Sequence, residues 1–268
     1  SPTIADLRAL NKLIRSTKVE PVKLVFHKLQ GPCRIVGFPD ASYRNNSDKS
    51  SQRGQVIFLA EPRASQNTFQ GRSQSESNVG PRWRPKDTPG SKDLTATKGS
   101  MVDYESHKIN RTTLSTTVSE LYSLMKCFGT CLFLKGLWRD LSGETALIHL
   151  RTDANNLVTT ARTTHLPEQR ETVHLISMLR KEACSGSIDD LAHVKSEDCL
   201  ADCLTKSSAK PDALIKAVET GNMPGTDAHL PFRELIQHKA YLIHWLAHHV
   251  HHAPALVTFL ASDIQSEI

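Results

Sequence analysis

Apolar residues recur along this chain with two different periods, and each period predicts one kind of element. Short apolar runs rich in Val and Ile, bounded by Gly, Pro and polar turns, predict strands. These strands cover residues 23–29, 34–38, 55–60, 100–106, 146–152 and 188–194. Apolar residues at helical spacing predict helices. These helices cover residues 4–18, 117–140, 155–162, 198–206, 212–220 and 232–248, and one more begins at residues 166–167.

The order of these elements predicts the topology of the sheet. Three core strands, at 34–38, 55–60 and 100–106, lead up to the long helix at 117–140, and strands that follow one another in this way pair as an antiparallel meander. The later strands are separated by helices, so they need crossover connections and add to the sheet in parallel. The expected fold is therefore α/β, with one mixed sheet of three antiparallel strands followed by parallel strands, and helices packed against it.

The composition changes abruptly within the predicted meander. Residues 63–98 are rich in Ser, Gly, Pro, Gln, Arg and Lys and contain few aliphatic side chains. Such a segment cannot bury enough apolar surface to offset the entropy of ordering it. We therefore expect a disordered insertion between the second and third strands.

Composition sets broad limits on function. The net charge of +5 and the isoelectric point near 8.9 fit a polyanionic partner, although the excess is mild. Neither a secretory signal nor an apolar run long enough for a bilayer is present, so we expect no membrane partner and an intracellular protein. The six cysteines have no Cys-x-x-Cys spacing, which predicts reduced thiols.

Four acidic residues lie at the edges of predicted elements, where a carboxylate suits a site better than a core. They are Asp40, Glu120, Asp153 and Asp202. Any one of them alone is more often a turn former or a helix cap. If the strands that end near Asp40 and Asp153 are parallel neighbours, however, both carboxylates emerge at one sheet edge, and Glu120 and Asp202 can reach it.

Converging carboxylates repel one another unless divalent cations lie between them. Carboxylate oxygens suit a hard cation such as Mg²⁺, and two such ions can hold the attacking and leaving oxygens of a phosphodiester. Asp40 is the expected bridge between the two ions, because it lies at the centre of the inferred sheet.

The segments around these carboxylates resemble the ribonuclease H domain of copia-type retrotransposon Pol polyproteins. The resemblance rests on Gly37-Phe-Pro-Asp-Ala-Ser-Tyr43, Leu114-Ser-Thr-Thr-Val-Ser-Glu120-Leu, Arg151-Thr-Asp153 and above all Leu200-Ala-Asp-Cys-Leu-Thr-Lys206. It covers roughly residues 34–206. The chain departs from the family pattern at several positions, including Ser42 in place of an Asp and Val118 in place of a Glu, but none of the four carboxylates is lost.

The resemblance implies a ribonuclease H-like mixed sheet and a function. In the family, an Asp-Glu-Asp-Asp set binds two Mg²⁺ ions, with Mn²⁺ as a substitute, and hydrolyses the RNA strand of an RNA/DNA hybrid. By motif this set is Asp40, Glu120, Asp153 and Asp202, each both catalytic and metal-binding. The implied partners are the hybrid and the reverse transcriptase portion of the same polyprotein. The implied location is a cytoplasmic particle or the nucleus.

The chain divides, on this basis, into three parts. Residues 1–22 are helical and resemble the segment that joins a reverse transcriptase to ribonuclease H. Residues 23–206 form the ribonuclease H-like domain, with its insertion at 63–98. Residues 207–268 form a C-terminal helical tail of unknown role. The alternatives are a catalytically dead nucleic-acid-binding relic, another nuclease or integrase of the same fold, and a structural remnant.

Three further features have a functional and a simpler interpretation. Zinc binding is one interpretation of Cys127, Cys131, Cys199 and Cys203, and core packing of helices is the simpler one. Metal capture by the histidines between residues 238 and 252 competes with a solvated helix face. Contact with nucleic acid is one interpretation of Trp83 and the arginines beside it, and a solvated loop is the simpler and favoured one.

Overall fold

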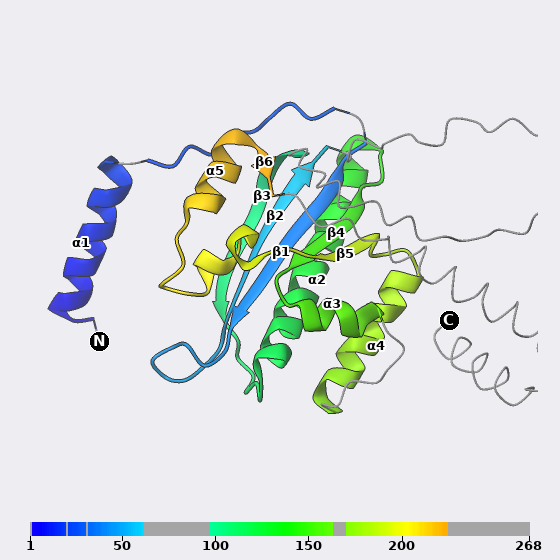
Figure 1. The fold of residues 1–268 in the computed structure, drawn as a ribbon. Helices are drawn as coiled ribbons and strands as arrows, with labels where there is room; N and C mark the ends of the chain where they lie inside the picture. The colour runs from blue at the N-terminus through cyan, green and yellow to red at the C-terminus, as the bar shows by residue number, and fades with distance from the viewer. Residues whose placement is uncertain (1, 20, 31, 62–96, 163–169, 225–268) are drawn as a thin grey trace, which may run out of the picture.

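A computed structural model describes residues 2–19, 21–30, 32–61, 97–162 and 170–224 of the chain (Figure 1). Its centre is a six-stranded sheet with the order β5-β4-β1-β2-β3-β6. The strands are β1 (Arg34–Ser42), β2 (Gln52–Ala60), β3 (Thr97–Lys108), β4 (Leu147–Thr152), β5 (Asp190–His193) and β6 (Asn222–Met223). Strands β1, β2 and β3 pair antiparallel, and β4 and β5 add in parallel beyond β1. The predicted α/β mixed sheet is confirmed.

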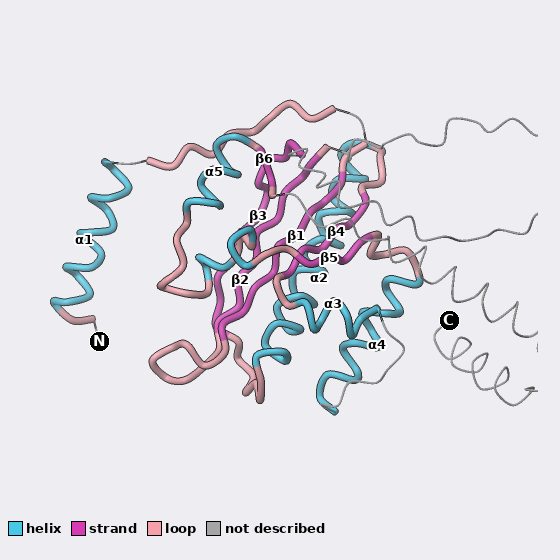
Figure 2. Tube along the Cα trace, viewed as in Figure 1, coloured by secondary structure: helices cyan, strands magenta, loops and turns pink. Residues whose placement is uncertain are grey.

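Helices flank this sheet, as Figure 2 shows by colour. They are α1 (Ile4–Val19), α2 (Thr116–Ser142), α3 (Asn155–Arg162), α4 (Arg170–Cys184) and α5 (Asp212–Thr220), with two short 3-10 turns, η1 (Ser196–Asp198) and η2 (Asp202–Leu204). The side chains of α1 are all exposed, and this helix lies apart from the sheet in both views. No helix among the described residues is long and apolar enough to cross a membrane.

Each face of the sheet has its own apolar core. One core joins β1 and β4 to α2, α3 and α4, and includes Ile35, Leu124 and Leu150. The other joins β1 and β2 to the segment that carries η2 and to α5, and includes Phe38 and Val218. Since side chains alternate along a strand, the even-numbered residues of β1 from Val36 onward face this second core. Asp40 therefore belongs to the face that the 3-10 turns cover.

Helix α2 lies unusually close to β1 because β1 has a glycine at the crossing point. A Cβ atom on Gly37 would lie 2.6 Å from the Sγ atom of Cys127 and 3.1 Å from that of Cys131. Both thiols are fully buried in the core. These two cysteines therefore pack in the core, as the simpler interpretation predicted.

The structure corrects three sequence-based expectations. Residues 23–29 form no strand, because the apolar side chains of Leu24 and Phe26 are exposed rather than paired into a core. Residues 198–206 hold the last residue of η1, then η2 and turns, rather than a helix, because Leu200 and Ala201 are buried against the sheet and α5 in the second core. Strand β6 was not predicted; it pairs with the first residues of β3.

Several expectations lie outside the described residues. One is the insertion predicted at 63–98, of which only the last two residues are described, as part of β3. The others are the start of the helix predicted from 166–167 and the helix predicted at 232–248. Trp83 and the histidine-rich segment also lie there. Residues 212–223, which the sequence analysis assigns to the tail, pack on the sheet through α5 and β6.

Candidate functional site

Asp40 lies in β1 and is completely buried. The hydroxyl of Thr205 donates a hydrogen bond to its Oδ2 atom, and the ammonium of Lys206 lies 3.5 Å from its Oδ1 atom. Burial raises the pKa of Asp40, the Thr205 hydrogen bond and Lys206 lower it, and the charges of Asp153 and Asp202 raise it again, so the pKa stays above its usual range. The sequence placed Asp40 at the strand end, whereas the strand continues to Ser42.

Asp153 follows β4 and lies level with Asp40. The parallel register pairs Gly37 with Leu150, and three residues further along each strand are Asp40 and Asp153. The Oδ2 atom of Asp153 accepts a hydrogen bond of 3.0 Å from the hydroxyl of Ser196 in η1. The prediction that parallel neighbouring strands bring these two carboxylates together is confirmed by this register.

Glu120 lies near the start of α2, and hydroxyl groups fix that end of the helix. The Ser115 side chain caps α2 by accepting a hydrogen bond of 3.2 Å from the Val118 backbone N–H. One turn past Glu120, the Ser123 hydroxyl donates to the backbone carbonyls of Asp40 at 2.7 Å and Gly54 at 3.1 Å. These bonds fasten the helix to the β1–β2 hairpin and hold Glu120 beside Asp40.

The carboxyl group of Glu120 is held in a nearly dry environment. Its residue is only 7% exposed, and its Oε2 atom has no hydrogen-bond partner among the described residues. Burial, together with the charges of Asp40 and Asp153, raises the pKa of Glu120 to about 9. The charge of Lys206 lowers this pKa only in part, so where no metal ion is bound the side chain is protonated at neutral pH.

Asp202 reaches the cluster through a lysine. It lies in η2, and its Oδ1 atom accepts a hydrogen bond from the Lys206 ammonium, which also faces Asp40. Burial lowers the pKa of Lys206, but the hydrogen bond to Asp202 and the charges of Asp40 and Asp202 outweigh it, so the pKa lies above its usual value. The ammonium thus neutralises two of the predicted ligands.

A cleft of about 570 Å³ opens beside these carboxylates. Its lining includes Glu120 and Asp153, with Lys206 on one side, and is otherwise small or polar. The other lining residues are Ala41, Ser42, Tyr43, Asn45, Thr116, Thr117, Ala154, Asn156 and Ser208. The polar lining can form hydrogen bonds with a ligand that carries hydroxyl groups. If that ligand is a polyanion, its negative charge needs Lys206 or bound metal ions beside the carboxylates.

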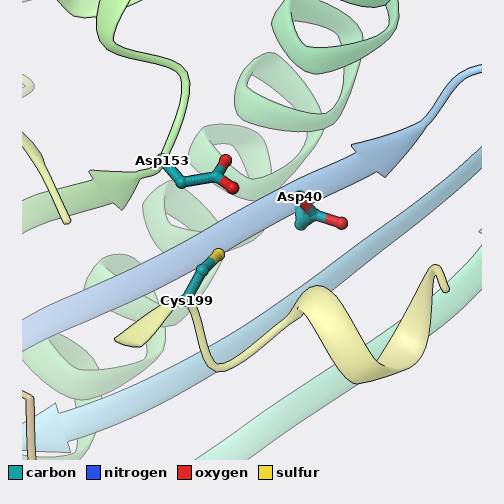
Figure 3. A group of neighbouring side chains, drawn as sticks. All are labelled: Asp40, Asp153 and Cys199. Carbon is teal, nitrogen blue, oxygen red and sulfur yellow. The ribbon is translucent and has the colours of Figure 1, made fainter. Parts of the chain in front are cut away.

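Cys199 is a member of the cluster that the sequence analysis did not assign to it. Its Sγ atom and oxygen atoms of Asp40 and Asp153 all lie within 4.8 Å of one another (Figure 3). The thiol donates a hydrogen bond of 3.8 Å to the Pro39 carbonyl, and burial, with the charges of both aspartates, raises its pKa well above the usual value. Its position three residues before Asp202 was the only signal in the sequence.

The residues present fit a divalent cation. Asp40 Oδ1 and Glu120 Oε2 are buried carboxylate oxygens that accept no hydrogen bond within the described ranges. Carboxylate oxygens of this kind are the ligands that Mg²⁺ prefers, and a cation would relieve their mutual repulsion. Oxygen atoms of Asp40 and Asp153 lie within 4.8 Å of each other, and Glu120 is near enough for both charges to act on it. Asp202 accepts a hydrogen bond from the Lys206 ammonium, which also lies 3.5 Å from Asp40.

No family model matches this chain, and no curated protein matches it. Several solved structures resemble it in shape. LC11-RNase H1 in complex with an RNA/DNA hybrid gives a TM-score of 0.40 at 15% identity, over 68% of this chain and 99% of that chain. The N-terminal RNase H domain of a Mycobacterium tuberculosis protein, fused to maltose-binding protein, gives a TM-score of 0.40 at 13% identity. This match covers 70% of this chain and 98% of that chain.

A viral protein gives a weaker match. Prototype foamy virus protease-reverse transcriptase has a TM-score of 0.31 at 12% identity, over 68% of this chain and 21% of that chain. Because identities of this size assign no family, an activity for this chain has to be argued from its own residues.

Proposed function

We propose that this chain is a ribonuclease H-type hydrolase that cleaves the RNA strand of an RNA/DNA hybrid with the help of Mg²⁺. One observation supports this above all: oxygen atoms of Asp40 and Asp153 lie within 4.8 Å of each other, and Glu120, on which both charges act, lines the same polar cleft as Asp153. Asp40, Glu120 and Asp153 are three of the four residues that the resemblance to copia-type Pol polyproteins singles out, and Asp202 is the fourth. Hybrid recognition would use backbone shape and 2′-hydroxyl groups rather than base edges.

The side chains around the carboxylates have positioning roles in this proposal. Thr205 and Ser196 each donate a hydrogen bond to one carboxylate, which fixes the orientation of Asp40 and Asp153. Asp40, Glu120, Asp153 and Asp202 would hold two Mg²⁺ ions, or Mn²⁺ in their place. Bound there, the ions would supply an activated water and charge stabilisation at the leaving 3′-oxygen.

We further propose that the chain acts as part of a copia-type retrotransposon Pol polyprotein. Its partners would be the RNA/DNA hybrid and the reverse transcriptase portion, and its location a cytoplasmic particle or the nucleus. The Leu200-Ala-Asp-Cys-Leu-Thr-Lys206 segment supports this assignment, since it is the motif most specific to that group.

The test is cleavage of a hybrid that carries a label on each strand, in Mg²⁺ and in EDTA. We expect the folded protein to cut only the RNA strand, and only with the metal. Asp153→Asn should lower the rate more than about a hundredfold, because it removes a charged ligand from the transition state. Asp140→Asn is the matched control, since Asp140 is exposed near the far end of α2.

Other substrates separate the rival functions. Cutting of plain duplex DNA, or strand transfer, would favour another nuclease or an integrase. Equal rates for Asp153→Asn and the unaltered chain would contradict the assigned site.

A catalytically dead nucleic-acid-binding relic is the second candidate, and one observation favours it. The Lys206 ammonium already contacts Asp40 and Asp202, where a second ion would have to bind. Salt-dependent binding of hybrid by a folded protein that never cuts, with or without its polymerase partner, would identify the relic.

A further inference from the structure

Cys199 places a thiol inside the carboxylate cluster, held there by its neighbours in the chain. The residue follows η1, is 4% exposed, and precedes Leu200 and Ala201, which are buried in the core beneath α5. Figure 3 shows Cys199, Asp40 and Asp153 approaching one another from three separate segments. Their ligand atoms lie within 4.8 Å of one another, so all three can face one ion.

Buried carboxylate oxygens that accept no hydrogen bond give a second observation at this cluster. Asp40 is 0% exposed and Glu120 is 7% exposed, yet Oδ1 of the first and Oε2 of the second accept no hydrogen bond from the residues that the structure describes. A buried oxygen left without a donor is costly, and such groups are usually satisfied by a proton, a water or an ion. Among the residues that the structure describes, Lys206 is the cation whose ammonium lies beside Asp40, at 3.5 Å from Oδ1.

The three ligand atoms of Asp40, Asp153 and Cys199 could coordinate one ion if they moved slightly closer together. An ion about 2.1 Å from an oxygen and about 2.3 Å from a sulfur, in tetrahedral geometry, holds those atoms roughly 3.6 Å apart. Movement of about 1 Å would bring the three ligand atoms to that separation. Serine in place of Cys199 would offer only a neutral oxygen.

The ligand set favours a different metal from the one that four carboxylates favour. Thiolate is a soft ligand that Mg²⁺ avoids and that Zn²⁺ and Cd²⁺ take readily, and divalent transition metals outcompete Mg²⁺ at mixed sites. We infer that Cys199, Asp40 and Asp153 form a binding site for a thiophilic divalent cation. On binding, a sulfur–metal bond forms, the Cys199 thiol proton passes to solvent, and the hydrogen bond from Sγ to the Pro39 carbonyl breaks.

Two clefts give an ion access to this site. Asp153 lines the cleft of about 570 Å³ described above, and Cys199 lines a second cleft of about 280 Å³ together with Ser196 and Asp202. An ion can therefore approach Asp153 from the first cleft and Cys199 from the second, whereas Asp40 lies behind them and lines neither.

The site shares two carboxylates with the proposed Mg²⁺ centre. A thiophilic cation would therefore displace Mg²⁺ and inhibit the proposed hydrolysis. This competition rests on the proposed function, whereas the binding itself does not, so the two are tested by different readouts.

The test is titration of the full chain with Cd²⁺ in the absence of nucleic acid, followed by the ultraviolet charge-transfer absorption of a cadmium–sulfur bond. We expect saturation at one equivalent. Cys199→Ser should abolish the absorption, and Asp153→Asn should weaken binding more than about tenfold. Cys203→Ser is the matched control, because Cys203 is nearby and half-buried and lies outside the cluster. Far-ultraviolet circular dichroism establishes that each variant is folded.

The outcomes separate clearly. Absorption that survives Cys199→Ser, disappears in Cys203→Ser, or never appears at stoichiometric Cd²⁺ overturns the site, whether or not the chain cleaves hybrid. If Cys199→Ser misfolds, the Asp153→Asn titration decides, since unchanged affinity there also overturns it. Excess Mg²⁺ should raise the Cd²⁺ concentration needed for half-saturation, which links this site to the carboxylate centre.

Discussion

At the scale of single residues, the site is a set of charges that oppose folding unless something neutralises them. Asp40 and Glu120 are buried beside Asp153, and burial is the largest reason that the pKa values of the first two are raised. The protein partly relieves this repulsion with the Lys206 ammonium and with a proton on Glu120. The Lys206 ammonium and the proton on Glu120 should each have a measurable effect on the free energy of unfolding.

Glu120→Gln should stabilise the metal-free protein at alkaline pH. The pKa of Glu120 is about 9 in the folded protein against 4.5 for the unperturbed side chain, so folding takes up a proton between these values. The free energy of unfolding of the unaltered chain therefore falls as pH rises from about 5 to about 9. Glutamine mimics the protonated form, so the variant should be about 2–4 kcal/mol more stable at pH 8 and nearly unchanged at pH 4.

Denaturant unfolding in EDTA at several pH values measures this effect. Glu144→Gln, at an exposed position, is the control and should change little. A Glu120→Gln protein with the same pH dependence as the unaltered chain would contradict the buried, protonated state of Glu120.

Lys206→Met should destabilise the protein by about 1–3 kcal/mol at pH 8, because it leaves the buried Asp40 without its nearest cation. The loss should shrink as pH falls and Asp40 becomes protonated. Thermal unfolding at pH 5 and pH 8 gives the comparison, with Lys210→Met at an exposed position as the control. A loss of the same size at both pH values would mean that Lys206 acts through packing rather than charge.

At the scale of elements, the position of α2 against β1 decides whether Glu120 reaches Asp40. The helix approaches closely at Gly37, where its own Cys127 and Cys131 side chains fill the space that a Cβ atom would need. The hydroxyl of Ser123 then ties the helix to the hairpin backbone. A substitution where α2 crosses β1 should therefore change both the free energy of unfolding and the position of Glu120 relative to Asp40.

Gly37→Ala should therefore cost about 1–3 kcal/mol, because the added methyl group would lie 2.6 Å from the Sγ atom of Cys127. Gly129→Ala, on the exposed side of the same helix with open space around it, should instead stabilise by about 0.5–1 kcal/mol. Chemical denaturation of both variants measures the contrast. Equal effects of the two changes would argue against this close crossing of α2 and β1.

At the scale of the whole molecule, the sheet needs cover on both faces. Helices α2, α3 and α4 cover one face, and the segment with η2 together with α5 covers the other (Figure 1). The second cover also carries Cys199, Thr205 and Lys206 to Asp40. Packing on this face is thus required for the site as well as for the core.

Val218→Asp should destabilise the protein by more than about 3 kcal/mol, because it puts a carboxylate at a position that is 4% exposed in the second core. Lys216→Asp, two residues earlier and exposed, should cost less than about 1 kcal/mol. Calorimetric unfolding measures both. A mild effect of Val218→Asp would mean that residues 207–224 belong to a tail that the sheet does not need.

The sequence alone determined most elements and the identity of the candidate carboxylates. Helices α3 and α5 have the predicted bounds, and β1, β2, β3, β4 and α2 differ only at their ends. Periodicity gives this much because a single buried face of each element leaves a local trace in the sequence. The parallel register of β1 and β4, inferred from the order of elements, followed from the same patterns.

Only the tertiary structure decided what surrounds the carboxylates. The contacts of Asp40 with Thr205 and Lys206, the approach of Cys199 to Asp153, and the pairing of β6 with β3 all join segments far apart in the chain. Residues 198–206 carry no periodic signal for 3-10 turns, because their shape is set by burial against β1 and β2 rather than by local propensity. Long-range packing therefore decided which side chains and charges surround the carboxylates, which no local pattern encodes.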